Sequence, residues 1–239
     1  MDSKEMLVQG SKELGIVLSD EQVSQFYQYY QELVTWNQKM NLTAITEEKE
    51  VIVKHFLDCL TPAVNFDFTT CTTLIDMGTG AGFPGIPLKI AYPHLKITLV
   101  DSLQKRIHFL QEVTKGLGLE NVECVHGRAE ELGQNSIYRE QYDLCVSRAV
   151  AHLSVLYEYT LPFIKTGGVF LALKGPNVKE ELEEGKKALQ VLGGQWKQTW
   201  IISLPYSDIT HSIVQIKKAR HTPTQYPRKA GKPSKSPII

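Results

Sequence analysis

The feature that most constrains the fold is a set of three closely spaced glycines directly after a short apolar segment. Residues 73–76 have the composition of a buried strand, and Gly78, Gly80 and Gly82 follow at alternate positions. Glycine tolerates positive φ and has no side chain, so such a loop can lie close to a ligand. In an open α/β sheet, ligands bind beyond the carboxyl ends of the strands. We therefore expect a ligand site at the end of this strand.

After residue 72, short apolar runs alternate with amphipathic stretches, which is typical of a doubly wound α/β sheet. The last two apolar runs have no helix between them, which predicts an antiparallel edge. The fold class is therefore α/β, with a mostly parallel Rossmann-like sheet. The expected strands are 73–76, 97–101, 122–125, 142–146, 168–173, 196–203 and 212–217, and the expected helices start near Gly85 or cover 103–117, 152–164 and 178–192.

The chain divides into three segments by sequence pattern. Residues 1–65 predict an N-terminal helical cap, with one helix capped near Ser19 and Asp20 and a second over 47–60. Residues 66–220 form the main α/β domain. Residues 221–239 are rich in Pro, Lys and Ser, which predicts an extended basic tail. The apolar face expected on the first of these helices comprises Val23, Phe26, Tyr27, Tyr30 and Val34.

Composition excludes several classes of protein. The 239 residues are 42% hydrophobic and 22% charged, which suits one sizeable globular core. No apolar run is long enough to cross a bilayer, and the polar N-terminus does not resemble a secretory signal, so we expect a cytoplasmic protein. The four cysteines lack zinc-site spacing, which predicts reduced thiols and no metal; a catalytic Cys145 is disfavoured by its place in an expected strand.

Charge is distributed unevenly although the net charge is zero. From Lys217 to Ile239 there are seven Lys or Arg residues and no acidic residue, whereas the preceding part carries all 26 acidic residues. A basic end on an acidic body suggests a polyanionic partner. A solvated tail that only aids solubility is the alternative, and charge alone leaves both interpretations open.

The loop spacing indicates which ligand it binds. The pattern is G-x-G-x-G, whereas the dinucleotide fingerprint is G-x-G-x-x-G with a pyrophosphate at the helix N-terminus. Pro84 and Pro87 follow the loop and remove backbone N–H donors where a phosphate would need them. This argues against NAD or FAD and favours S-adenosyl-L-methionine, which has no phosphate. Asp101, at the end of the second expected strand, can accept hydrogen bonds from both ribose hydroxyls, although such an acid is also a common helix cap.

The stretch from Ile75 to Leu88 closely resembles the family of bacterial ribosomal RNA small subunit methyltransferase G, also called glucose-inhibited division protein B. The similarity extends over nearly the whole chain, and the Gly-Phe-Pro-Gly-Ile-Pro element is specific to that family. The resemblance implies a class I methyltransferase that modifies N7 of one guanine in 16S rRNA, using S-adenosyl-L-methionine. Other segments that match are Trp36–Asn37, Asn41–Thr43, Leu99–Ser102, Lys105–Arg106, Phe109–Leu110, Arg128–Glu131 and Ser147–Ala149.

The resemblance also implies roles for individual residues. Gly78 and Phe83 would contact the cofactor, and Ala129 with Glu130 would hold its adenine. Arg148 would border the methyl-transfer pocket. Arginine is the usual donor to guanine and N7 must stay free to react, so we expect Arg148 to hold O6 or a nearby phosphate. The structural alternatives are a core Phe83, a helix-start Glu130 and a surface-paired Arg148.

The basic residues are expected to bind RNA, with 16S rRNA or the small ribosomal subunit as partner of a monomeric enzyme that has no membrane contact. On this interpretation, deleting residues 224–239 weakens rRNA binding and leaves cofactor affinity nearly unchanged. Rival functions are a small-molecule or protein methyltransferase, an NAD-dependent oxidoreductase and a non-catalytic RNA-binding protein. The expected RNA contacts are Lys105, Arg106, Arg228, Lys229, Lys232 and Lys235.

Overall fold

The computed structural model describes residues 1–239 and contains one seven-stranded sheet in the order β3-β2-β1-β4-β5-β7-β6. Strands β1 to β5 pair in parallel, and β7 pairs antiparallel with both β5 and β6. The expected α/β sheet with an antiparallel edge is confirmed. The strands are β1 (Thr73–Met77), β2 (Lys96–Asp101), β3 (Val122–His126), β4 (Tyr142–Arg148), β5 (Ile164–Lys174), β6 (Gly194–Ser203) and β7 (Thr210–Lys218).

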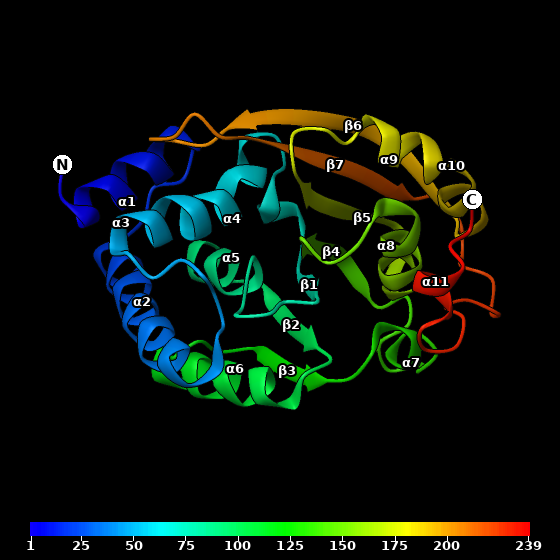
Figure 1. Ribbon diagram of the computed structural model, residues 1–239, viewed down its shortest axis with the longest axis horizontal. Helices are drawn as coiled ribbons and strands as arrows, with labels where there is room; N and C mark the ends of the chain where they lie inside the picture. Colours follow the sequence, from blue (N-terminus) through cyan, green and yellow to red (C-terminus); the bar gives the residue numbers. More distant parts are fainter.

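Helices cover both faces of the sheet (Figure 1). One apolar core joins the N-terminal helices, α5 and α6 to one face, and a second core joins α8 and α10 to the other. No helix is long and apolar enough to cross a membrane. The helices are α1 (Ser3–Glu13), α2 (Asp20–Met40), α3 (Glu48–Val51), α4 (Asp58–Leu60), α5 (Gly85–Ala91), α6 (Gln104–Gly116), α7 (Ala129–Leu132), α8 (Leu153–Thr160), α9 (Lys179–Glu184), α10 (Lys186–Val191) and α11 (Lys232–Lys235).

Helix α2 begins as the sequence predicts but turns a different face inward. Ser19 and Gln22 form a reciprocal capping box, which satisfies two backbone N–H groups at the helix start. The expected inner face included Tyr27, Tyr30 and Val34, and these three side chains are only partly buried. Tyr29 is fully buried instead, together with Val23, Phe26 and Leu33. The face was misjudged because tyrosines occupy several neighbouring positions and helical spacing alone does not choose among them.

The second N-terminal helical segment contains a π-helical turn that the sequence does not reveal. Residues Ile52–Leu57 form i→i+5 turns between the α-helical pieces α3 and α4. Such turns occur often at functional sites because they widen the helix and redirect side chains. Here the turn presents His55 toward β4, and Asp58 follows directly after it.

The C-terminal segment corrects the expectation of an extended tail. Residues 221–239 fold back beside α7 and α8 and end in the short helix α11 (Figure 1). Pro227 and Pro233 are buried, and Arg139 donates hydrogen bonds to several carbonyls of the segment. The prolines therefore pack against the body instead of stiffening a free tail.

Candidate cofactor site

The glycine loop lies between the ends of β1 and β4 and depends on the absence of side chains. Gly78 has φ +72°, and a Cβ there would lie 2.6 Å from a methyl group of Val150. Gly82 has φ +98°, and its Cβ would clash with Ile86 and with the hydroxyl of Tyr29. The Tyr29 hydroxyl donates a hydrogen bond to the carbonyl of Ala81 over 2.5 Å, so α2 fixes the loop from behind.

The backbone N–H groups of this loop are almost all engaged within the protein. Gly78 and Thr79 both donate to the carbonyl of Val100, and Gly80 donates to the carboxylate of Asp101. Pro84 has no backbone N–H group. Among the other residues of 78–86, only Ala81 has an N–H group without a protein acceptor. A phosphate site needs several convergent free N–H groups. The structure therefore disfavours a pyrophosphate ligand at this loop.

Asp76 accepts a hydrogen bond from the first backbone N–H group of the helix that follows the loop. Its Oδ2 accepts hydrogen bonds from the hydroxyl of Thr79 at 2.6 Å and from the N–H of Gly85, the first residue of α5, at 2.8 Å. The other carboxylate oxygen is buried and has no partner. Burial raises the pKa of Asp76 to about 7, against an ordinary value of 3.8.

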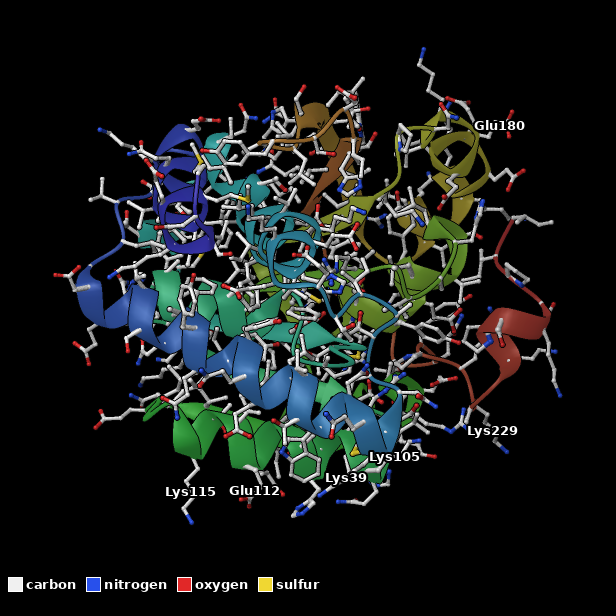
Figure 2. The ribbon with its side chains drawn as sticks, turned by 60° about the vertical axis from the view of Figure 1, so that its left-hand side comes forward. Lys39, Lys105, Glu112, Lys115, Glu180 and Lys229 are labelled. Carbon is white, nitrogen blue, oxygen red and sulfur yellow. The ribbon has the colours of Figure 1, made fainter.

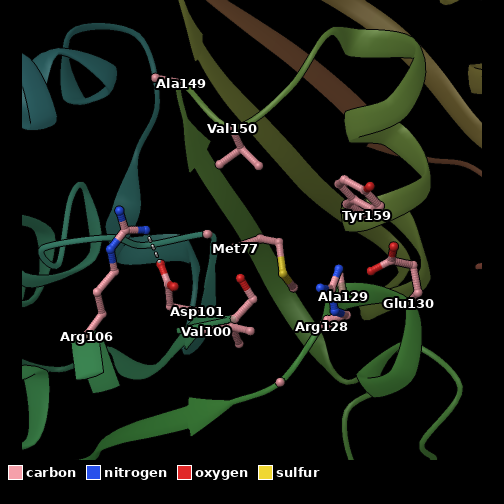
Figure 3. Close-up of a pocket in the computed structure, with 13 residues that line it drawn as sticks. Met77, Val100, Asp101, Arg106, Arg128, Ala129, Glu130, Ala149, Val150 and Tyr159 are labelled. Carbon is pink, nitrogen blue, oxygen red and sulfur yellow. Dashed lines mark hydrogen bonds and ion pairs between the residues drawn. The ribbon is translucent and has the colours of Figure 1, made fainter. Parts of the chain in front are cut away.

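A cavity of about 340 Å³ opens beside the loop, at the carboxyl ends of β1, β2, β3 and β4. This volume lies within the range of small-molecule sites. Figure 3 shows Asp101 and Arg106 on one side of the cavity and Ala129, Glu130 and Tyr159 on the opposite side. Asp101, Arg106 and Gly78, which also lines the cavity, are called the loop wall, and Ala129, Glu130 and Tyr159 the α7 wall. The remaining lining residues are Met77, Val100, Ser102, Gly127, Arg128, Ala149 and Val150.

Asp101 is the most heavily bonded side chain of the loop wall. One oxygen accepts from the N–H of Leu103, and the other accepts from Gly80 and from Arg106, at 3.0 and 3.2 Å. Its side chain is 3% exposed and faces the cavity. Asp101 can therefore both cap the following helix and contribute to a ligand site. Arg106, expected to bind RNA, is instead paired with Asp101 at the cavity (Figure 3).

The α7 wall is formed by residues just after β3 and by one tyrosine of α8. Ala129 and Glu130 are both buried. These two residues and Tyr159 line the cavity. The carboxylate of Glu130 accepts a hydrogen bond of 2.8 Å from the N–H of Gly231 in the C-terminal segment. A residue 101 positions away thus fixes a side chain of the cavity.

The other two residues that the resemblance implicated, Phe83 and Arg148, lie behind the cavity and do not line it. Phe83 is 6% exposed and stacks on the ring of His55, with ring centroids 4.7 Å apart. The guanidinium carbon of Arg148 lies 4.9 Å from the centroid of the Phe83 ring. The structure thus places both residues in a packed cluster.

Asp58 holds Arg148 in that cluster. The Arg148 side chain is 17% exposed and donates a hydrogen bond of 2.7 Å to Asp58 Oδ2. The other oxygen of Asp58 pairs with His211 of β7. These partners keep the pKa of Asp58 below its ordinary value although its burial opposes this. This ion pair uses Nη1 of Arg148, so a contact with a guanine would have to use other N–H groups of the guanidinium.

His55 completes the cluster as a neutral imidazole. Burial and the nearby Arg148 lower its pKa to about 4. Its Nε2 lies 2.8 Å from the hydroxyl of Thr43, and the N–H of Thr43 donates to the side chain of Asn37. Asn37 and Thr43, which belong to the two N-terminal motifs, therefore support His55.

The expected RNA contacts have different surroundings. Lys105, Lys229, Lys232 and Lys235 are exposed, and Figure 2 shows Lys105 and Lys229 pointing outward from α6 and from the C-terminal segment. Arg228 is bonded through its guanidinium to Glu158, whose side chain is 0% exposed. The four lysines thus have exposed side chains, whereas Arg106 and Arg228 are each paired with an acid.

The cavity fits S-adenosyl-L-methionine on the chemistry of its lining. Asp101 is a buried acceptor that suits a ribose diol, and Ala129 offers an apolar surface for a base. At Gly78 a Cβ would collide with Val150, so glycine is what lets these two lining residues lie against each other. The loop provides no phosphate-binding N–H cluster. These features together define an S-adenosyl-L-methionine-dependent methyltransferase of class I.

Solved structures support the fold. The chain resembles mitomycin 7-O-methyltransferase MmcR with a TM-score of 0.56 and 17% identity, covering 80% of this chain and 60% of that chain. It resembles TrmN from Thermus thermophilus with a TM-score of 0.51 and 15% identity, covering 70% and 53%. At these identities the likeness concerns the fold alone.

Sequence relatives identify the family. Residues 22–206 match the family described as rRNA small subunit methyltransferase G. The chain is 57% identical over 238 residues to ribosomal RNA small subunit methyltransferase G of Alkaliphilus metalliredigens, covering 100% of both chains. It is 54% identical to the protein of that name from Oceanobacillus iheyensis, covering 98% of both. The chain belongs to the rRNA small subunit methyltransferase G family, as the sequence motifs predicted.

Sequence reasoning missed Asp58, His211 and Tyr159. Each comes from a segment whose local pattern indicates only a helix or a strand. The one available signal for Asp58 was an acid in an otherwise apolar helical stretch, where a buried charge requires a partner. Nothing local indicates which arginine or histidine provides it.

Proposed function

We propose that this chain transfers the methyl group of S-adenosyl-L-methionine to N7 of one guanine in 16S rRNA of the small ribosomal subunit. The observation that carries the proposal is the glycine loop, whose N–H groups are engaged internally while the buried Asp101 faces a cavity of suitable size. Membership of the family extends this from a cofactor site to an rRNA substrate.

The reaction needs little acid–base catalysis from the protein. When bound, S-adenosyl-L-methionine supplies a methyl group on a sulfonium, which the in-plane lone pair of guanine N7 can attack in line. N7 carries no proton, so no residue has to act as a base. The contribution of the chain is to orient the two reactants and to fix charge around them.

Individual residues then have distinct tasks. Asp101 accepts hydrogen bonds from the ribose, and Ala129 with Glu130 borders the adenine. Gly78 and Gly80 let the backbone approach the methionine part. Phe83 supports the loop from the core. Gly82 has no side chain, which lets Tyr29 and Ile86 pack against the loop.

Arg148 has a positioning role in this proposal. Its guanidinium donates to Asp58 and lies over the ring of Phe83, so it is held in the cluster and does not line the cavity. The pair instead fixes the carboxyl end of β4. The next residues, Ala149 and Val150, line the cavity and are exposed, so they can meet the incoming guanine.

The lysines provide the RNA surface. Lys105, Lys229, Lys232 and Lys235 project into solvent and can follow a phosphate backbone. We propose that the enzyme acts as a monomer on 16S rRNA or an assembled subunit in the cytoplasm and uses no metal.

Mapping N7-methylguanine in 16S rRNA with and without the gene tests the substrate assignment. The proposal expects one guanine to lose its methyl group when the gene is absent and to regain it on complementation. An unchanged map would contradict the rRNA assignment. Transfer of labelled methyl groups to protein or metabolite fractions would favour the rival methyltransferase functions.

A further inference from the structure

The C-terminal residues 226–235, called the strap below, connect the end of the chain to the cofactor cavity. Helix α11 contacts α8, and Figure 1 shows it beside α8 and close to α7. Both α7 and α8 supply residues of the α7 wall. The strap therefore lies behind one wall of the cavity and does not line it.

The first attachment of the strap is Arg228. Its backbone N–H donates to Glu158 Oε1 at 2.7 Å, and its guanidinium contacts both carboxylate oxygens at 2.6 to 3.1 Å. Glu158 is fully buried on α8 and precedes Tyr159, which lines the cavity. A buried carboxylate needs a partner, so this contact specifies where the strap docks.

The second attachment is Gly231. Its N–H donates to Glu130 Oε1 over 2.8 Å, and Glu130 is 6% exposed in the α7 wall. Gly231 has φ +77°, and no atom lies near the position of a Cβ. Glycine is therefore required here by the backbone conformation and not by lack of space, because most other residues rarely adopt a positive φ.

We infer that the strap is a positioning element of the cofactor pocket: docked through Arg228, it uses the N–H of Gly231 to orient Glu130 for the cofactor. The inference rests on the proposed function only for the identity of the cofactor. It reverses the expectation that residues 224–239 are dispensable for cofactor binding. Without Gly231, the carboxylate of Glu130 lacks its partner and can turn away from its place in the wall.

A chain that ends at Lys229 tests the inference, since it keeps Arg228 on Glu158 and removes Gly231. We expect S-adenosyl-L-methionine to bind about tenfold more weakly by calorimetry, the scale of one hydrogen bond to a charged group. The shortened chain also loses the buried Pro233, so affinities should be compared at a temperature at which thermal unfolding shows both cofactor-free proteins to be folded. Amides of α7 should exchange hydrogen faster in the cofactor-free protein. Equal affinity of the two chains would overturn the inference.

The matched control removes charge without removing the strap. The full chain with Lys232→Ala and Lys235→Ala loses the same two cations and should bind the cofactor as the unsubstituted protein does. A weakening equal to that of the shortened chain would assign the effect to charge and overturn the inference.

A second pair of variants applies if the shortened chain does not fold. Gly231→Val disfavours φ +77°, whereas Gly231→Asn tolerates it. We expect weaker cofactor binding for valine and nearly normal binding for asparagine. Equal affinities would contradict the role of Gly231. These assays contain no RNA, so a negative result would contradict the role of the strap but not the rRNA substrate. An unchanged methylation map would contradict the rRNA substrate but not the role of the strap.

Discussion

The two walls of the cavity are built by different means. The loop wall draws on β1, β2 and the glycine loop, where backbone groups satisfy one another within a stretch of about 25 residues. The α7 wall takes Glu130 from one segment and Tyr159 from another, and the C-terminal strap holds them. The difference indicates that the loop wall is organised by local sequence, whereas the α7 wall depends on the end of the chain.

The largest expected effect concerns the support behind the loop wall. Asp58→Ala leaves the buried guanidinium of Arg148 without its carboxylate, so the free energy of unfolding should fall by about 3–5 kcal/mol in urea titrations. Adding Arg148→Met should recover part of that loss. The exposed Asp208→Ala is the control and should change stability by less than about 0.5 kcal/mol. A single variant Asp58→Ala as stable as the control would show that the cluster contributes nothing.

The next effect concerns the loop wall itself. Asp101→Ala removes the acceptor for Gly80, Leu103 and Arg106 and for the ribose, so the cofactor dissociation constant should rise about 100-fold. Asp101→Asn keeps an oxygen acceptor and should lose less. Calorimetry on both variants measures this. A change below about threefold for alanine would remove Asp101 from the site.

Asp76 predicts a pH dependence of stability behind the same loop. Its folded pKa of about 7 exceeds its ordinary value of 3.8, so between these values the folded state holds more protons than the unfolded state. The contribution of Asp76 to stability therefore falls as pH rises from about 4 to 7, by up to about 1.4 kcal/mol per pH unit. Asp76→Asn should lack this component. Parallel stability profiles of the two proteins would contradict the prediction.

The smallest expected effect concerns the exposed lysines of the strap, as distinct from the contacts by which the strap docks. Replacing Lys229, Lys232 and Lys235 by alanine should weaken binding to a 16S rRNA fragment about tenfold and reduce the salt slope by about 2. Cofactor affinity should not change, because none of the three lines the cavity. An unaltered salt slope would show that RNA does not contact the strap.

Local sequence patterns predicted the sheet and the loop wall because their determinants are local. The cap at Ser19 acts three residues from its partner Gln22, and Asp101, at the end of the next strand along the chain, lies 21 positions from its partner Gly80. The central strands β1, β2 and β4 matched because buried parallel strands appear as short apolar runs.

The remaining features require contacts between distant segments. Asp58 and Arg148 are 90 positions apart, and Gly231 and Glu130 are 101 positions apart. Arg228 has the sequence context of a free RNA-binding cation, and only the fold shows that Glu158 neutralises it. Such pairs leave no local pattern, so the α7 wall and the support of Arg148 could not be predicted.

The most direct test of the account is methyl transfer by the purified chain. Small subunits from a strain that lacks the gene are incubated with labelled S-adenosyl-L-methionine, and the modified base is then identified. The account predicts up to one methyl group per subunit, at N7 of a single guanine, and almost none with Asp101→Ala. Transfer to another atom or to protein, or full activity of that variant, would contradict it.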